Sequence, residues 1–442
     1  MKLTYNVQDK PTFGKTILFA LQQLLAIMAA TIAVPAIIGN GMSSTAALFG
    51  AGVGTLVYLL FTKFKSPVFL GSSFAFLGSM GAAFAGAAST AAGYVGLILG
   101  AVIAGLVYVI IALVVKYVGV NWINKLMPAV IIGPTVASIG LSLAGNAIGD
   151  LTKQFTLLDA NSSYVSIICG LVTLFTVIAC SVFGKKMMKM IPFIIGILAG
   201  YLVATIFTVI GNAADIAAFK VIDFSVFKEM KWIPDFTFVT AFKGVKDIDL
   251  AYIGTIAVAY APVAFVVFAE HIADHKNLSS IIENDLLEEP GLHRTLLGDG
   301  VGSMAGALFG GCPNTTYGES VGCVAISGNA STITILYTAI MAILISFFGP
   351  FSTFLSTIPS CVMGGVCIAL YGFIAVSGLK MIQKVDLNDN KNLFVVSVIL
   401  ICGVGGLTLT FGKITLTTVA CSLILGILTN LLVNIKGKNH QE

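Results

Sequence analysis

The sequence predicts an all-α polytopic membrane protein with about 14 transmembrane segments. The first observation is composition: of 442 residues, 57% are hydrophobic and only 10% are charged, and the mean hydropathy is +0.99. Soluble domains carry roughly 25% charged residues, so a water-soluble globule is excluded. The second observation is that apolar runs of spanning length recur from one end of the chain to the other. The third is the placement of Lys and Arg between those runs.

The runs are each long enough to cross a membrane, with boundaries good to about four residues. They lie at about 14–38, 45–62, 67–86, 91–115, 126–146, 163–183, 191–211, 249–272, 295–311, 312–328, 330–349, 358–379, 393–410 and 415–435. Two of them, 67–86 and 312–328, open with a proline and a hydroxyl-rich stretch. Such broken segments are stable at membrane depth only where they are buried in protein or line a cavity. We therefore expect two half-helices, each preceded by a short extended strand.

The distribution of basic residues sets the orientation. With the N-terminus in the cytoplasm, fourteen spans place 17 of the 24 Lys and Arg residues inside and 7 outside, five of them in the 212–248 loop. This positive-inside bias predicts that both termini are cytoplasmic in a plasma (inner) membrane. The net charge is only +4 and no basic cluster occurs, so nucleic-acid binding is not expected. The eight cysteines form no C-x-x-C pair and are expected to be buried apolar residues, not metal ligands.

Fourteen spans divide into two repeats of seven, and a repeat with an odd number of spans returns inverted in the membrane. The two interrupted segments are both third in their half, and paired interrupted segments in corresponding positions point to a transporter's binding site. Both segments read proline, paired hydroxyls, then an aromatic residue: Pro67, Ser72, Ser73 and Phe74, and Pro313, Thr315, Thr316 and Tyr317. The sequence therefore predicts two inverted seven-span repeats with a solute site between the two half-helices.

Glu319 is the strongest candidate site residue, since a carboxylate inside an apolar run costs about 3 kcal/mol and marks function by default. If a half-helix begins at Gly318, its free N–H groups would donate to a ligand carbonyl, while Glu319 would accept ligand N–H groups. The site suits a small flat solute with alternating N–H and C=O groups. The alternative is an ordinary helix cap.

Glu270 ends another long apolar run, where burial favours the neutral carboxyl. A neutral carboxyl offers one donor and one acceptor, so protonation would be required for binding and would couple transport to protons. The alternative is an interfacial Glu paired with Lys276 or His275. Asp274 lies one helical turn beyond Glu270 and either relays protons or begins a loop. Asp299 is expected to have a packing role, and no zinc motif is present.

Six segments carry a resemblance to a known family: "LQQLLAIMAATIAVP", "GSSFAF", "AEHIADH", "PGLHRTLLGDG", "NTTYGESVG" and "ALYGFIAVSG". In order and spacing the chain resembles the nucleobase–ascorbate transporter family, and within it the uracil permeases. The resemblance implies core-domain parts at 1–120 (spans 1–4) and 249–350 (spans 8–11). It implies gate-domain parts at 121–248 (spans 5–7) and 351–442 (spans 12–14). It also implies a homodimer and proton-coupled uracil uptake by an elevator-like movement, with no cofactor besides the coupling proton.

The matching motifs imply roles for individual residues of this sequence. They imply that Glu270 and Glu319 hold the base and that Gly318 and Phe74 contribute backbone N–H groups. The remaining residues implied to shape or close the pocket are Ser73, Ala30, Tyr317 and, from the gate side, Tyr371. Glu270 and Asp274 would handle the coupling proton.

Three positions depart from the family pattern. Asp274 replaces a His, Ser320 replaces the usual Asn after the second Glu, and Gln23 replaces a His in the first span. A purine permease of the same family is therefore a second hypothesis. An anion transporter of the same architecture is a third, which the acidic Glu319 disfavours. We find no catalytic set for a membrane enzyme.

Overall fold

Apolar segments in a membrane form helices because every backbone N–H and C=O must be paired within the protein. The computed structural model describes residues 3–119, 128–153, 162–185, 188–189, 191–411 and 414–435, and it is mostly helical. Eight helical segments in this part are long and apolar enough to cross a membrane. They are α1 (Phe13–Ile38), α2 (Ser44–Phe61), α4 (Thr90–Val118), α6 with α7 (Ala129–Ser142 and Ala144–Thr152), α8 (Ser162–Phe183), α10 (Pro192–Ala214), α12 (Leu250–Ile282) and α17 (Ser360–Ile382).

Several expected spans are shorter or broken. Helices α15 (Thr332–Ile345) and α16 (Gly349–Thr357) meet at an angle of 81°, and Pro350 lies in the first turn of α16, where a proline is tolerated. The other short helices are α3 (Leu77–Ala85), which follows the 3-10 turn η1 (Phe74–Phe76), α14 (Gly318–Ser327), α18 (Asn390–Val404) and α19 (Thr418–Val433). Helix α13 (Leu292–Gly310) has 19 residues but is not among the eight apolar spans. The turn η5 (Leu287–Gly291) joins α12 to α13.

The expected long loop after α10 contains little regular structure. Its elements are η2 (Ala217–Phe219), η3 (Phe224–Lys228), α11 (Thr237–Gly244) and η4 (Val245–Asp247). The short helix α11 packs against α4 and α13. The loop is therefore attached to the α2–α4–α13 part of the molecule as well as following α10.

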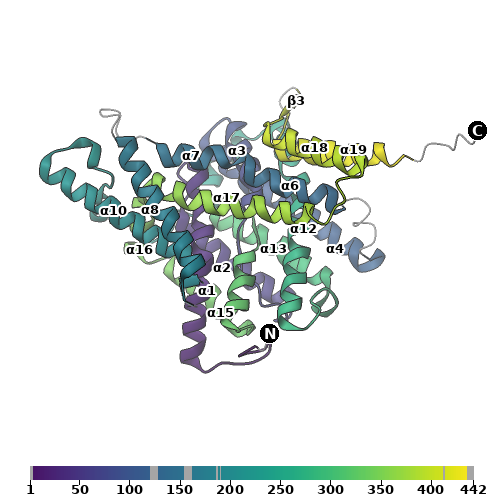
Figure 1. Ribbon diagram of the computed structural model, residues 1–442, viewed down its shortest axis with the longest axis horizontal. Coiled ribbons are helices and arrows are strands. Elements are labelled where there is room, and N and C mark those ends of the chain that lie inside the picture. The colour runs from purple at the N-terminus through teal and green to yellow at the C-terminus, as the bar shows by residue number, and fades with distance from the viewer. Residues whose placement is uncertain are drawn as a thin grey trace, which may run out of the picture.

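The helices pack in two groups (Figure 1). In the first group, α13 packs against α2 and α4, α12 against α3 and α4, and α15 against α1 and α2. In the second group, α17 packs against α6, α7 and α8, α10 against α8, and α18 against α6 and α19. Contacts between the groups are fewer and run mainly from α12 to β4 (Ile414–Leu416), α19 and α6, and from α1 to α10 and α17. The sequence separates each group into two stretches, which the fold brings together.

Two short strands lie among the helices of the first group. Strand β1 (Leu70–Ser72) pairs antiparallel with β2 (Asn314–Thr316), so that Gly71 faces Thr315. Both strands are fully buried and each precedes a short helix, as the sequence predicts. A second hairpin, β3 (Leu409–Phe411) with β4 (Ile414–Leu416), joins α18 to α19 and was not predicted.

The N-terminal segment crosses the connection between α14 and α15. The backbone N–H of Thr4 donates to the carbonyl of Gly328 at 2.7 Å, and Ala330 N–H donates to the carbonyl of Tyr5 at 2.9 Å. Further along, Thr332 N–H donates to the carbonyl of Val7 at 3.1 Å. This segment therefore fixes the far end of α14, the helix that carries Glu319.

The contact between α2 and α13 depends on small residues, which let membrane helices approach closely. A methyl group added at Gly54 would lie 2.7 Å from the carbonyl oxygen of Gly302 and 2.6 Å from Asn314 Nδ2. We predict that Gly54→Ala lowers stability by about 1–3 kcal/mol, because the backbones must separate. The measurement is the thermal unfolding midpoint of the detergent-solubilised protein. The control is Gly145→Ala, where nothing lies within 4 Å of the new methyl group. Equal midpoints for the two variants would contradict this account of the interface.

Candidate functional site

The strand pair brings together the starts of two short helices from distant parts of the chain. Ser73 N–H donates to the carbonyl of Pro313 at 2.9 Å, which extends the β1–β2 ladder by one bond. Beyond this bond η1 begins at Phe74, and at the other end of the antiparallel ladder, after Thr316, α14 begins at Gly318. Neither start has a side-chain cap. Backbone N–H groups in the first turn of a helix have no partner within that helix, so both starts can donate to a ligand.

A cavity of about 410 Å³ lies at these helix starts. Its walls come from Ser73 and η1, β2 and α14, α12, and the second-group helices α6, α10 and α17. The lining residues are Ser73, Phe74, Ala75, Val136, Ile139, Phe193, Glu270, Ala273, Asp274, Thr315, Thr316, Tyr317, Gly318, Glu319, Leu370, Phe373, Ile374, Ser377 and Met381. The cavity therefore lies between the two helix groups.

Six of the eight candidate binding residues line this cavity: Ser73, Phe74, Glu270, Tyr317, Gly318 and Glu319. The other two do not. Ala30 is buried in α1, and Tyr371 is buried in α17 with its ring edge-on to Phe74 at a centroid distance of 6.0 Å. Tyr371 thus supports the wall from the second helix group. The hydroxyl of Tyr317 donates to the carbonyl of Ser72 at 2.5 Å, so its polar atom is held by the backbone of β1.

Three carboxyl groups face the cavity. Glu270 and Asp274 lie one turn apart on α12, and Glu319 lies in the first turn of α14. Asp274 Oδ2 accepts a hydrogen bond from Thr316 Oγ1 at 2.8 Å, which ties α12 to β2. Among the described residues that line the cavity, none is basic. Asp274 is therefore part of the cavity wall and does not begin a loop, because α12 continues to Ile282.

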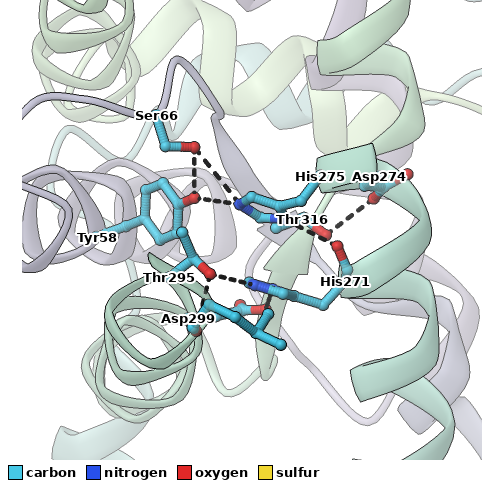
Figure 2. A network of polar contacts seen from close by, with 9 residues as sticks. Tyr58, Ser66, His271, Asp274, His275, Thr295, Asp299 and Thr316 are labelled. Carbon is cyan, nitrogen blue, oxygen red and sulfur yellow. Dashed lines mark hydrogen bonds and ion pairs between the residues drawn. The ribbon is translucent and has the colours of Figure 1, made fainter. Parts of the chain in front are cut away.

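The adjacent face of α12 carries a second polar network (Figure 2). His271 Nδ1 lies 2.7 Å from Asp299 Oδ2, and His271 Nε2 lies 2.9 Å from Thr295 Oγ1. His275 Nε2 lies 2.7 Å from the hydroxyl of Tyr58. Both imidazole rings are fully buried and stack with centroids 4.0 Å apart. His275 therefore pairs with Tyr58 of α2 and with the carbonyl of His271, which excludes it as the partner of an interfacial Glu270.

Hydrogen-bond counting fixes one proton in this network. Thr295 Oγ1 donates its only proton to the carbonyl of Leu292 at 3.0 Å, so it must accept from His271 Nε2–H. The short contact between His271 Nδ1 and Asp299 then needs one proton, carried by either partner. Asp299 has the packing position that the sequence predicts, but its partner His271 was missed. The i, i+4 spacing of His271 and His275 was the signal, since it places both rings on one helix face.

Two positions that depart from the family pattern contact each other. Gln23 Nε2 in α1 donates to Ser320 Oγ in α14 at 2.6 Å. Ser320 Oγ also accepts from the backbone N–H of Phe69 at 3.1 Å. The pair therefore links α1, the approach to β1, and the first turn of α14, directly behind Glu319.

Comparison with known proteins places the chain. A family described as "Permease family" matches residues 14–412. The uracil permease of Bacillus caldolyticus is 39% identical over 437 residues, covering 98% of this chain and 95% of that protein. The uracil permease of Bacillus subtilis (strain 168) is 37% identical over 442 residues, covering 98% of this chain and 95% of that protein. The uracil permease of Escherichia coli (strain K12) is 34% identical over 424 residues, covering 96% of this chain and 92% of that protein.

Solved structures with a similar fold are more distant in sequence. The transmembrane domain of the cyanobacterial bicarbonate transporter BicA superposes with a TM-score of 0.64 at 15% identity, covering 96% of this chain and 99% of that one. The overall structure of SLC26A9 superposes with a TM-score of 0.65 at 13% identity, covering 95% of this chain and 64% of that one. The similarity shows a shared fold. Because its relatives at 34–39% identity are permeases, the chain is a multi-pass membrane transport protein and not an enzyme. It belongs to the permease family that includes these bacterial uracil permeases.

Proposed function

We propose that the chain carries uracil across the plasma (inner) membrane together with protons. The observation that carries the proposal is the cavity in which two helix starts meet three carboxyl groups. Uracil is a small flat ring with alternating N–H and C=O groups, which is the pattern this wall can pair. The names of the relatives support the same solute, since the matches at 34–39% identity that cover nearly the full chain are uracil permeases.

Each wall residue has a role in this proposal. Glu270 and Glu319 accept or share protons with the ring N–H groups, and the backbone N–H groups at Phe74 and Gly318 donate to the ring carbonyls. The Phe74 ring offers a stacking face, supported by Tyr371 at 6.0 Å. Ser73 and Tyr317 shape the space. Gly318 suits close approach of the ligand to the backbone because it has no side chain.

Two other solute classes fit less well. A purine base offers a similar hydrogen-bonding edge, and a cavity of about 410 Å³ does not by volume reject its second ring. An anion is disfavoured more strongly. BicA is a bicarbonate transporter with a similar fold, but here the described lining residues include three carboxyl groups and no basic residue.

The proposed movement follows from where the cavity lies. The first helix group would be the core domain (1–120 and 249–350) and the second the gate domain (121–248 and 351–442). An elevator-like movement would carry the core, with Glu270 and Glu319, past α6, α10 and α17. The structure has fourteen segments if the bent pair α15–α16 counts once and α3, α13, α14, α18 and α19 are added to the eight long spans. We propose that these fourteen segments form two inverted repeats of seven. Cytoplasmic termini and a homodimer complete the proposal.

The solute assignment is tested by competition in cells or proteoliposomes. Unlabelled uracil should abolish uptake of radiolabelled uracil, whereas xanthine, guanine and bicarbonate in the same excess should leave most of it. The reason is that buried polar groups left unpaired by the wrong edge cost about 1–3 kcal/mol each. Stronger competition by xanthine than by uracil would show that the solute is a purine and not uracil.

The two binding carboxylates are tested by isosteric replacement. We expect Glu270→Gln and Glu319→Gln each to weaken uracil binding by about tenfold or more, because a ligand group loses its partner inside the cavity. The measurement is a calorimetric dissociation constant for the purified protein. Glu288→Gln, at an exposed position outside the cavity, is the matched control and should bind as the parent does. Unchanged affinity in Glu319→Gln would refute its role.

Proton coupling is tested at Asp274. Protonated Glu270 is the binding form, so uptake should fall as pH rises through the titration of Glu270. The negative charge of Asp274, one turn away, favours that protonated form. Asp274→Asn should therefore shift the half-maximal pH of uptake downward, by about one unit, while solute selectivity stays the same. Asp274→His should retain more activity than Asp274→Leu, since imidazole exchanges protons near neutral pH.

The same proteoliposome experiment has an internal control. Glu288→Gln removes a negative charge at an exposed position outside the cavity, so its pH profile should lie close to that of the parent protein. An acid-outside gradient should drive accumulation and a protonophore should abolish it. A profile unchanged in all three Asp274 variants, or uptake that needs sodium and ignores pH, would refute the proposed coupling.

A further inference from the structure

A second cavity adjoins the solute cavity at the seam between the two helix groups. Its volume is about 650 Å³, and it shares Ala273 and Met381 with the first cavity. One wall is α12, with Phe268 and Ile272, and the other is the start of α6, with Ala129 and Ile132. These walls are apolar. The solute proposal makes no use of this space, which we name the basic cavity.

The charges around the basic cavity are opposite in sign to those of the solute cavity. Its described lining residues include two lysines, Lys276 and Lys384, and no carboxylate. Lys276 lies near the end of α12, and Lys384 follows the end of α17 by two residues. Both lysines are exposed. Cationic residues near the ends of two long apolar helices mark the boundary between membrane and water.

The arrangement is therefore amphipathic: an apolar chamber with positive charge at the water boundary. A free inorganic anion would use the lysines but not the apolar walls, and a neutral base would use neither charge. A phospholipid with an anionic headgroup uses both parts, since its chain replaces membrane lipid against α6 and α12 while its phosphate pairs with the ammonium groups.

We propose that the basic cavity binds an anionic phospholipid whose headgroup bridges Lys276 and Lys384. Lys276 belongs to the first helix group and Lys384 to the second, so the lipid joins the two groups at their seam. The site is distinct from the solute cavity and does not depend on which solute is carried.

The test uses the purified full-length protein in detergent, mixed with phosphatidylglycerol, and native mass spectrometry to count retained lipid. The parent protein should retain phosphatidylglycerol in preference to phosphatidylcholine. Each lysine near an anionic head contributes a factor of about five, so Lys276→Gln with Lys384→Gln should weaken retention about thirtyfold. The matched control is Lys380→Gln with Lys391→Gln, two exposed lysines next to the same region that do not line the cavity.

Two further arms separate the sources of binding. Ala129→Phe fills the apolar part without changing charge, so it should reduce retention of the lipid. Excess inorganic phosphate should not displace the lipid, because it cannot use the apolar walls. Equal retention by the two double variants would overturn the proposal. Full displacement by inorganic phosphate would overturn it in favour of a simple anion site.

Discussion

The pairing of β1 with β2 is the constraint on which the site depends. Extended backbone at membrane depth is stable only if its N–H and C=O groups find partners, and here two three-residue strands supply them to each other. Neighbouring side chains complete the set: Thr55 Oγ1 accepts from Leu70 N–H at 2.9 Å, and Ser320 Oγ accepts from Phe69 N–H at 3.1 Å. Because the strands pair antiparallel, η1 follows the Ser72 end of the short ladder and α14 follows the Thr316 end, and both starts line the same cavity. The strand pair thus holds together the two parts of the cavity wall that carry the helix starts.

Helix α12 connects this site to the rest of the first helix group. Its cavity face carries Glu270 and Asp274, and the adjacent face carries His271 and His275 in contact with α13 and α2. Buried imidazoles need partners for both ring nitrogens, and the structure provides them through Asp299, Thr295, Tyr58 and, for His275 Nδ1, the carbonyl of His271. A rotation of α12 that moved Glu270 away from the cavity would break these buried contacts. The histidine network therefore holds the carboxyl groups at the cavity wall.

Much of this could be predicted from the sequence because the signals are local. Proline and hydroxyl residues before a short apolar run predicted both strands, and a carboxylate in an apolar run predicted Glu319 as a wall residue. The partners of His271 and His275 could not be predicted, since Asp299 and Tyr58 are distant in sequence and only the packing of α2 and α13 brings them near. Tyr371 was expected to close on the pocket, but it packs behind Phe74 because Leu370, Phe373 and Ile374 occupy the cavity side of α17. The β3–β4 hairpin escaped prediction because its residues are as apolar as those of the flanking helices.

Packing differs between the interior of each helix group and the seam between them. Within the groups, glycines allow backbone contact, as between Gly54 of α2 and Gly302 of α13, or between Gly140 of α6 and the backbone of Ala375 in α17. At the seam, the contacts are fewer and enclose two cavities. Relative movement costs least where fewest close contacts are lost, so displacement is expected at the seam. Such a displacement would leave Glu270, Asp274 and Glu319 in place relative to one another, since all three belong to one group, and would change only the wall that α6, α10 and α17 provide.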